Sequence, residues 1–207
     1  MDVATTLFVV VIIIFSAIIH EVMHGYAADL LGDKTARYAG RLTLNPIPHI
    51  DLFGSIIIPL VLVLGGSPIF FGYAKPVPYN PYNLRPGRFS EAIVAGAGPA
   101  SNFVIALIGG LLIRSGILGQ AASVAFLIVV VNVMLCFFNL IPIPPIDGSK
   151  VLEALLPRGL AHAYFHWRRR MEANPLLGMA LVLLVVIVLG SLWSDLIYTV
   201  ARWLSGM

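Results

Sequence analysis

Long apolar segments alternate with shorter polar stretches along the 207 residues of the chain. A transmembrane helix needs about 20 consecutive, mostly apolar residues. Four segments meet this requirement, namely residues 3–31, 89–113, 121–141 and 175–204. The pattern therefore predicts an all-α polytopic membrane protein with about four full transmembrane helices.

A fifth apolar segment, residues 55–73, is interrupted by Pro59, by Gly65 and Gly66, and by Pro68. A proline inside a helix removes a backbone hydrogen bond and clashes with the preceding turn. The segment is also at the lower limit of spanning length. We therefore predict that it is re-entrant or broken.

Two proline-containing stretches connect the apolar segments. Residues 33–54 include Asn45-Pro46-Ile47-Pro48-His49-Ile50-Asp51, which predicts an irregular loop at the membrane surface because its prolines oppose helix formation. His49 and Asp51 could form a second metal site or a gate, or could make hydrogen bonds within the loop. Residues 71–81 alternate proline with apolar and aromatic residues, which predicts an extended interfacial segment. That segment could be a rigid linker or an edge that holds a substrate strand through backbone hydrogen bonds.

The region before the last apolar segment is strongly basic. Residues 151–156 predict a short helix, and residues 158–170 predict a basic loop that contains four arginines. We expect these arginines to face anionic lipid headgroups. His162 and His166 have the spacing of one helical turn but lack an acidic companion, and we interpret them as interfacial residues.

The composition agrees with an integral membrane protein. The chain is 59% hydrophobic and 11% charged, and its mean hydropathy of +0.94 lies outside the range of soluble domains. No hydrophilic stretch is long enough to fold separately, so we predict one integral membrane domain over residues 1–207. We expect the lipid bilayer as a partner and no nucleic acid. Asp2, with no Lys or Arg before the first apolar segment, argues against a cleaved signal peptide.

The first apolar segment contains a His-Glu-x-x-His pattern at His20, Glu21 and His24. On a helix, positions 20 and 24 lie one turn apart on the same face, with Glu21 beside them. Two neutral imidazoles bind zinc well, and an adjacent glutamate can act as a general base toward water. Each ionisable group in an apolar span costs about 2.5–3.5 kcal/mol, so the cluster needs something that pairs with it. The pattern predicts a zinc site, and the alternative is a buried polar cluster between helices.

A candidate third ligand follows the apolar segment 121–141. Three prolines in four residues unwind the chain there, and Asp147 and Gly148 follow after Ile146. Unwound backbone near membrane depth is tolerated where it is buried in protein or lines a wet cavity. Asp147 could therefore supply a carboxylate to zinc, and the alternative is an exposed loop aspartate.

Three motifs occur in order along the chain. They are His20-Glu21-x-x-His24, then Gly98-Pro99 with Asn102, then Asn139-x-x-Pro142-x-Pro144-Pro145-x-Asp147-Gly148. In this order they resemble the site-2 protease family of intramembrane zinc metallopeptidases, and the resemblance covers essentially the whole chain.

The resemblance implies a role for each residue of the site. His20, His24 and Asp147 would bind one zinc ion per chain, and Glu21 would be the catalytic base. Asn139 would contact the substrate or polarise the scissile carbonyl. Residues 45–54 and 71–83 resemble a compact bacterial or archaeal subgroup. The sequence shows no PDZ or nucleotide-sensing domain of the kind that many relatives carry, which leaves substrate selection open.

We therefore predict a zinc endopeptidase that cuts transmembrane segments of other membrane proteins, as in regulated intramembrane proteolysis. A transmembrane protein substrate is the expected partner. The alternative is a divalent metal ion transporter or channel that uses His20, His24 and Asp147 as a transit site. Glu21 distinguishes the two hypotheses, because hydrolysis needs a base beside the ligands and transit does not.

The topology follows from requiring the three ligands to meet. His20, His24 and Asp147 all lie near the C-terminal ends of their segments, so the first segment and segment 121–141 must run in the same direction. Of the 13 Lys and Arg residues, Arg114 and Arg202 are then the two at the opposite end. Because cytoplasmic loops are rich in Lys and Arg, we predict both termini outside and an active site nearer the cytoplasmic face of a bacterial or archaeal cell membrane.

Overall fold

The computed structural model describes residues 3–51, 54, 57, 61 and 74–207. Four long apolar helices, each of sufficient length and hydropathy to cross a membrane, dominate these residues. They are α1 (Val3–Leu30), α4 (Ser90–Arg114), α5 (Ala122–Asn139) and α8 (Pro175–Ser205). The described residues contain no β-strand. The prediction of an all-α polytopic membrane protein is confirmed.

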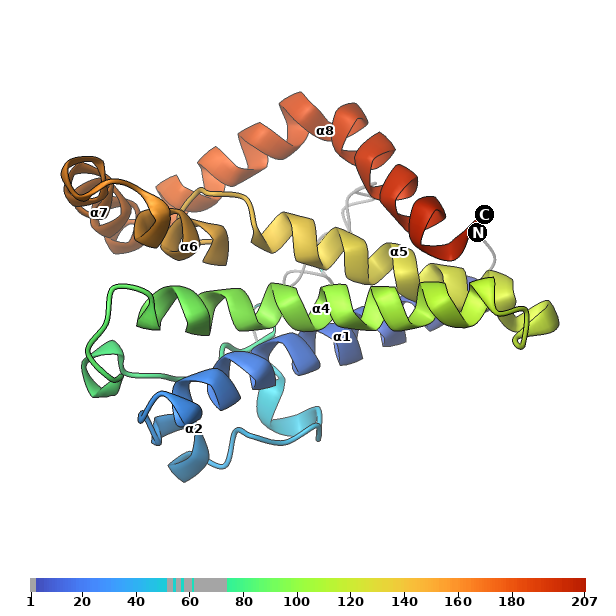
Figure 1. The fold of residues 1–207 in the computed structure, drawn as a ribbon, viewed down its shortest axis with the longest axis horizontal. Coiled ribbons are helices and arrows are strands. Elements are labelled where there is room, and N and C mark those ends of the chain that lie inside the picture. Colours follow the sequence, from blue (N-terminus) through green and yellow to red (C-terminus); the bar gives the residue numbers. More distant parts are fainter. Residues whose placement is uncertain (1–2, 52–53, 55–56, 58–60, 62–73) are drawn as a thin grey trace.

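Figure 1 shows that α1, α4 and α5 lie side by side, with α4 between the other two. Helices α1 and α5 run in the same direction and α4 runs in the opposite one, as the predicted topology requires. Both chain termini lie at one end of the bundle (Figure 1). The segment predicted to be re-entrant or broken, residues 55–73, lies outside the described residues apart from Ile57 and Val61.

Helix α8 packs against the bundle mainly through its C-terminal part. Its residues Ile197, Ala201 and Leu204 share a buried cluster with Val129 of α5 and Ala106 of α4. A Cβ atom at Gly110 would lie 2.7 Å from the carbonyl oxygen of Leu204, so this glycine permits the close approach of α4 and α8. Figure 1 shows a sharp bend in α8. Gly190 and Ser191 lie at the midpoint of its range, and Gly/Ser pairs are a common cause of such kinks.

Short helices connect the long ones at the end of the bundle opposite the termini. The polar loop after α1 contains α2 (Thr35–Tyr38) and the 3-10 helix η1 (Ile47–His49), and a second 3-10 helix, η3 (Pro81–Asn83), precedes α4. The N–H of Arg85 donates to the carbonyl of Leu31 at 2.7 Å, which joins the end of α1 to the chain entering α4.

Residues 158–170 form a helix, so the prediction of a basic loop was wrong for this segment. They belong to α7 (Arg158–Ala173), which follows α6 (Asp147–Leu155). Arg168 explains the difference, because its side chain is buried and pairs with three carboxylates contributed by three helices. These are Glu153 of α6 at 2.7 Å, Glu172 of α7 at 2.8 Å and Glu91 of α4 at 3.3 Å.

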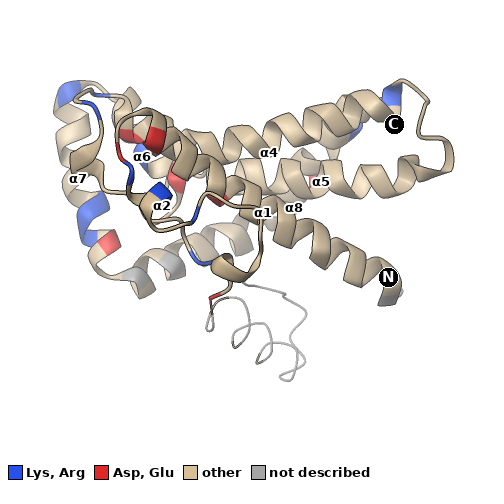
Figure 2. Ribbon diagram, turned by 90° about the horizontal axis from the view of Figure 1, so that it is seen from below, with Lys and Arg blue, Asp and Glu red and all other residues tan. Residues whose placement is uncertain are grey.

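Charged residues gather at the end of the bundle that holds α2, α6 and α7 (Figure 2). At the opposite end, Arg114 donates from Nε to the carbonyl of Leu204 at 2.9 Å. The distribution matches the charge asymmetry that the sequence predicts.

Candidate metal centre

His20 and His24 lie one turn apart on α1, and both side chains are buried. Their ring centroids are 4.6 Å apart and nearly perpendicular. The Oδ2 atom of Asp147, at the start of α6, lies 3.1 Å from Nε2 of His20 and 3.1 Å from Nε2 of His24. The structure thus brings together the three residues that the sequence predicts as metal ligands.

Gly148 lets Asp147 reach the two histidines. The chain leaves α5, passes through the prolines and enters α6 at Asp147. A Cβ atom at position 148 would lie 2.3 Å from the carbonyl oxygen of Leu140 and 2.6 Å from that of Ile141. Any other residue would push α6 away from the end of α5, and with it the Asp147 carboxylate.

The hydrogen bonds of the histidines determine which ring nitrogen is available. Nδ1 of His24 lies 2.7 Å from the carbonyl oxygen of Val94, which can only accept, so Nδ1 carries the proton. Nδ1 of His20 lies 2.6 Å from Oδ1 of Asn102. Both Nε2 atoms are therefore unprotonated when the rings are neutral, and both point toward Asp147. Such support from a carbonyl or amide oxygen is typical of metal-binding histidines.

Two buried asparagines hold the acceptor for His20 in place. Nδ2 of Asn102 donates to Oδ1 of Asn132 at 2.9 Å and to the carbonyl of Ser16 at 3.3 Å. Nδ2 of Asn132 donates in turn to Oγ of Ser16 at 3.0 Å and to the carbonyl of Ile128 at 2.9 Å. These bonds orient the Asn102 amide so that its oxygen faces His20. The motif that contains Asn102 does not by itself predict this contact. Its signal in the sequence is an amide side chain within an apolar span.

Gly98 of α4 provides the space for both imidazoles. A Cβ atom at this position would lie 2.5 Å from Nε2 of His20 and 2.6 Å from Nε2 of His24. The backbone of α4 at Gly98 therefore forms a wall of the site.

The other predicted site residues lie in different surroundings. Glu21 accepts a hydrogen bond on Oε2 from the N–H of Val77 at 2.9 Å. Asn139 donates from Nδ2 to the carbonyl of Leu135 in its own helix at 2.9 Å. This bond lies within α5 and does not test the predicted role of Asn139, which stays a prediction.

His49 and Asp51 do not form a second cluster of metal ligands in the described part of the chain. The buried ring of His49 donates from Nε2 to the carbonyl of Thr43 at 2.9 Å. Oδ1 of Asp51 accepts from the N–H of Gly54 at 2.7 Å. These contacts agree with the prediction of hydrogen bonds within the loop.

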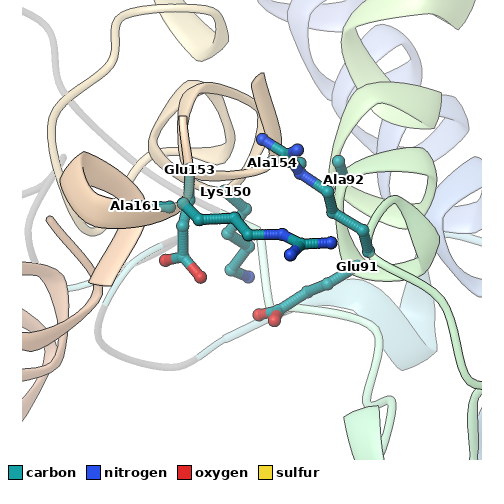
Figure 3. Close-up of a pocket in the computed structure, with 8 residues that line it drawn as sticks. Glu91, Ala92, Lys150, Glu153, Ala154 and Ala161 are labelled. Atoms are coloured by element: carbon teal, nitrogen blue, oxygen red, sulfur yellow. The ribbon is translucent and has the colours of Figure 1, made fainter. Parts of the chain in front are cut away.

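A charged pocket of about 440 Å³ lies beside the centre, between α4, α6 and α7. Figure 3 shows Glu91 from α4 and Lys150 and Glu153 from α6 at its wall. Lys150 follows Asp147 by about one helical turn and donates to the hydroxyl of Tyr79 at 2.9 Å. The pocket therefore begins one helical turn from Asp147, at Lys150 of the same helix.

The donor set fits zinc. Two imidazole nitrogens and a carboxylate oxygen, all within 4.8 Å of one another, are three protein ligands of the kind found in catalytic zinc sites. Such sites leave a fourth position for water or substrate. Four apolar helices, this donor set and the neighbouring Glu21 define a membrane metallopeptidase as the class of protein.

Comparison with known proteins agrees with this class. A model of peptidase family M50 matches residues 114–185. "Putative zinc metalloprotease YwhC" of Bacillus subtilis is 39% identical over 163 residues, which are 74% of this chain and 71% of that protein. "Putative zinc metalloprotease Rip2" of Mycolicibacterium smegmatis is 33% identical over 152 residues, which are 68% of this chain and 54% of that protein. No solved structure matches the chain. The chain belongs to peptidase family M50, the site-2 proteases.

Proposed function

We propose that this protein is an intramembrane zinc endopeptidase that binds one zinc ion through His20, His24 and Asp147. Its substrates are membrane proteins, which it cleaves within or near their transmembrane segments. The observation that carries this proposal is the convergence of both Nε2 atoms on Oδ2 of Asp147, at 3.1 Å each, with both Nδ1 atoms bonded to acceptors. This arrangement leaves three ligand atoms free to bind one ion.

A zinc ion held there would activate a water molecule and polarise the scissile carbonyl. Glu21 accepts a proton from the attacking water as the new C–O bond forms at the peptide carbonyl carbon. It then delivers that proton to the leaving amine as the C–N bond breaks, so Glu21 returns to its initial ionised state. Asn139 contacts the substrate near the scissile carbonyl.

The substrate must unwind locally before cleavage. A helical substrate hides its peptide carbonyls in its own hydrogen bonds, and an extended stretch exposes them. The active site lies nearer the cytoplasmic face of the cell membrane, and this orientation is supported by the basic residues around α2, α6 and α7 (Figure 2).

The experiment is cleavage of a panel of single-span membrane proteins by the purified protein, with and without a chelator and after zinc is restored. We expect cleavage that the chelator abolishes and zinc restores. Glu21→Gln should keep its zinc and lose cleavage, because it removes the base while preserving size. Asp147→Ala should lose zinc, measured by metal analysis, whereas Asp195→Ala on the exposed surface of α8 should retain it.

Two outcomes would contradict the proposal. Full zinc content and activity in Asp147→Ala would remove the third ligand. Zinc flux into liposomes that persists in Glu21→Gln, without proteolysis by the wild-type protein, would favour a transporter.

A further inference from the structure

The proline-rich segment before η3 lies against α1 beside the metal centre. Residues 76–78 are Pro76, Val77 and Pro78, and proline has no backbone N–H. Val77 therefore carries the one backbone donor of these three residues. That donor bonds to Oε2 of Glu21 at 2.9 Å.

The side chain of Val77 fixes the segment on α1. Val77 is 4% exposed, whereas Pro76 and Pro78 are exposed. A Cβ atom at Gly25 would lie 2.8 Å from Cγ1 of Val77, so the valine sits closely over this glycine. Gly25 is one helical turn after Glu21, and the two residues share a face of α1. Val77 thus contacts that face with its side chain and with its N–H.

Contacts on both sides of Val77 hold the donor in place. Before it, the N–H of Lys75 donates to the carbonyl of His49 at 2.8 Å, and the carbonyl of Lys75 accepts from Nη2 of Arg41 at 2.7 Å. After it, the N–H of Asn80 donates to Oδ2 of Asp33 at 2.6 Å. Arg41, His49 and Asp33 are all buried, so these anchors belong to the interior of the fold.

We propose that the N–H of Val77 positions the carboxylate of Glu21, and that the loop containing Arg41 and His49 braces this donor. The inference rests on the proposed role of Glu21 as the base. A hydrogen bond on Oε2 restricts rotation of the carboxylate and leaves Oε1 for proton transfer. The proline-rich segment is then a part of the catalytic apparatus, in addition to the linker or substrate-edge roles that its sequence suggests.

The test compares Val77→Pro with Val77→Ala, using a single-span membrane protein that the wild-type chain cleaves. Val77→Pro removes the N–H and suits the extended backbone favoured before Pro78. Val77→Ala keeps the N–H and removes most of the side chain. Because a general base contributes about 10²–10⁴-fold, we expect Val77→Pro to lower kcat about 10-fold or more. KM and zinc content should stay unchanged in Val77→Pro. Both variants lose the packing of the valine on Gly25, so the retained N–H should give Val77→Ala a clearly higher kcat than Val77→Pro.

A backbone ester at position 77 provides the same test with the valine side chain intact. Incorporation of α-hydroxyisovaleric acid replaces the N–H with oxygen, and the expected loss of kcat is again about 10-fold or more. This variant decides the question if Val77→Pro fails to fold. Equal kcat in Val77→Pro and Val77→Ala, or wild-type kcat in the ester, would overturn the inference.

Hydrogen exchange tests the bond without turnover. The Val77 amide should exchange more slowly in the wild-type protein than in Glu21→Ala, which lacks the acceptor. Equal exchange would contradict the inference. Glu21→Gln separates the two proposals. If Glu21→Gln keeps cleaving, the proposed function fails. If it is inactive while Val77→Pro and Val77→Ala have equal kcat, only the positioning role of Val77 is rejected.

Discussion

Asn102 accepts a hydrogen bond from His20 across a separation of 82 residues, with 2.6 Å between Oδ1 and Nδ1 and both side chains buried. This bond joins α4 to the ligand helix α1 and sets the proton on the far side of the imidazole from Asp147. In the proposed zinc site, the amide of Asn102 would therefore support His20 as a ligand without itself contacting the ion.

Loss of this support should weaken zinc binding. We expect Asn102→Ala to lower zinc affinity by about 10–100-fold, the usual cost of removing a partner of a metal-bound histidine. Competition with a chelator of known affinity measures this change. Phe103→Ala is the matched control, because Phe103 is the next residue on α4 and its side chain is 39% exposed. Wild-type zinc affinity in Asn102→Ala would contradict the supporting role.

A single methyl group on α4 should disrupt the metal centre. In Gly98→Ala the new Cβ would lie 2.5 Å from Nε2 of His20, so the imidazoles must move and zinc content and cleavage should both fall. The cost of such overpacking is about 1–3 kcal/mol. Gly96→Ala is the control on the same helix, because its Cβ would meet its nearest neighbour, Cγ2 of Val151, at 3.9 Å. Equal zinc content in the two variants would show that the centre tolerates the methyl group.

Asp33 should make the stability of the fold depend on acid pH. Its carboxylate is buried, which by itself raises the pKa, but hydrogen bonds from Thr35, Asn80 and Asn83 outweigh burial and lower the pKa below 3.8. A carboxyl group with a lowered folded-state pKa stabilises the fold above its unfolded pKa, and this contribution is lost as the pH falls through the folded-state pKa.

The measurement is the thermal unfolding midpoint of detergent-solubilised protein from pH 7 down to pH 3. We expect the unfolding temperature of the wild-type protein to decrease once the pH is lowered below about 4, where an ordinary aspartate becomes protonated. Asp33→Asn should be less stable than wild type at pH 7, with a smaller difference at pH 3. A constant difference across this range would show that ionisation of Asp33 contributes nothing to stability.

The sequence predicts much of the framework, because the length of an apolar segment and the spacing of two histidines are local properties. The four long helices and the shared face of His20 and His24 follow from them. Requiring His20 and Asp147 to meet also predicts the relative directions of α1 and α5.

Long-range contacts could not be predicted in this way. The bond from Val77 to Glu21 spans 56 residues, and the ion pair from Arg168 to Glu91 spans 77. Arg168 sits in a stretch of arginines that is typical of an exposed segment, and its burial depends on carboxylates from three separate helices. Local pattern carries no information on such partners, and for this reason the run of arginines in α7 predicts a loop and not a helix.

The arrangement of α1, α4 and α5 predicts which loops share a side of the membrane. Tyr82, before α4, lies at the charged end of the bundle and is 86% exposed, whereas Gly119, between α4 and α5, lies at the end of the termini. In a Cys136→Ser background, which removes the one native cysteine, Tyr82→Cys and Gly119→Cys should therefore react with a membrane-impermeant thiol reagent from opposite sides.

The direction of labelling also tests the proposed orientation. The proposed orientation has the charged end in the cytoplasm, because cytoplasmic loops are rich in Lys and Arg. Gly119→Cys should then react in intact cells, and Tyr82→Cys only after the cells are opened. Labelling of both positions from outside would contradict the antiparallel crossing of α4 that brings Gly98 and Asn102 beside the histidines. Labelling of Tyr82→Cys alone from outside would keep the fold and reverse its orientation in the membrane.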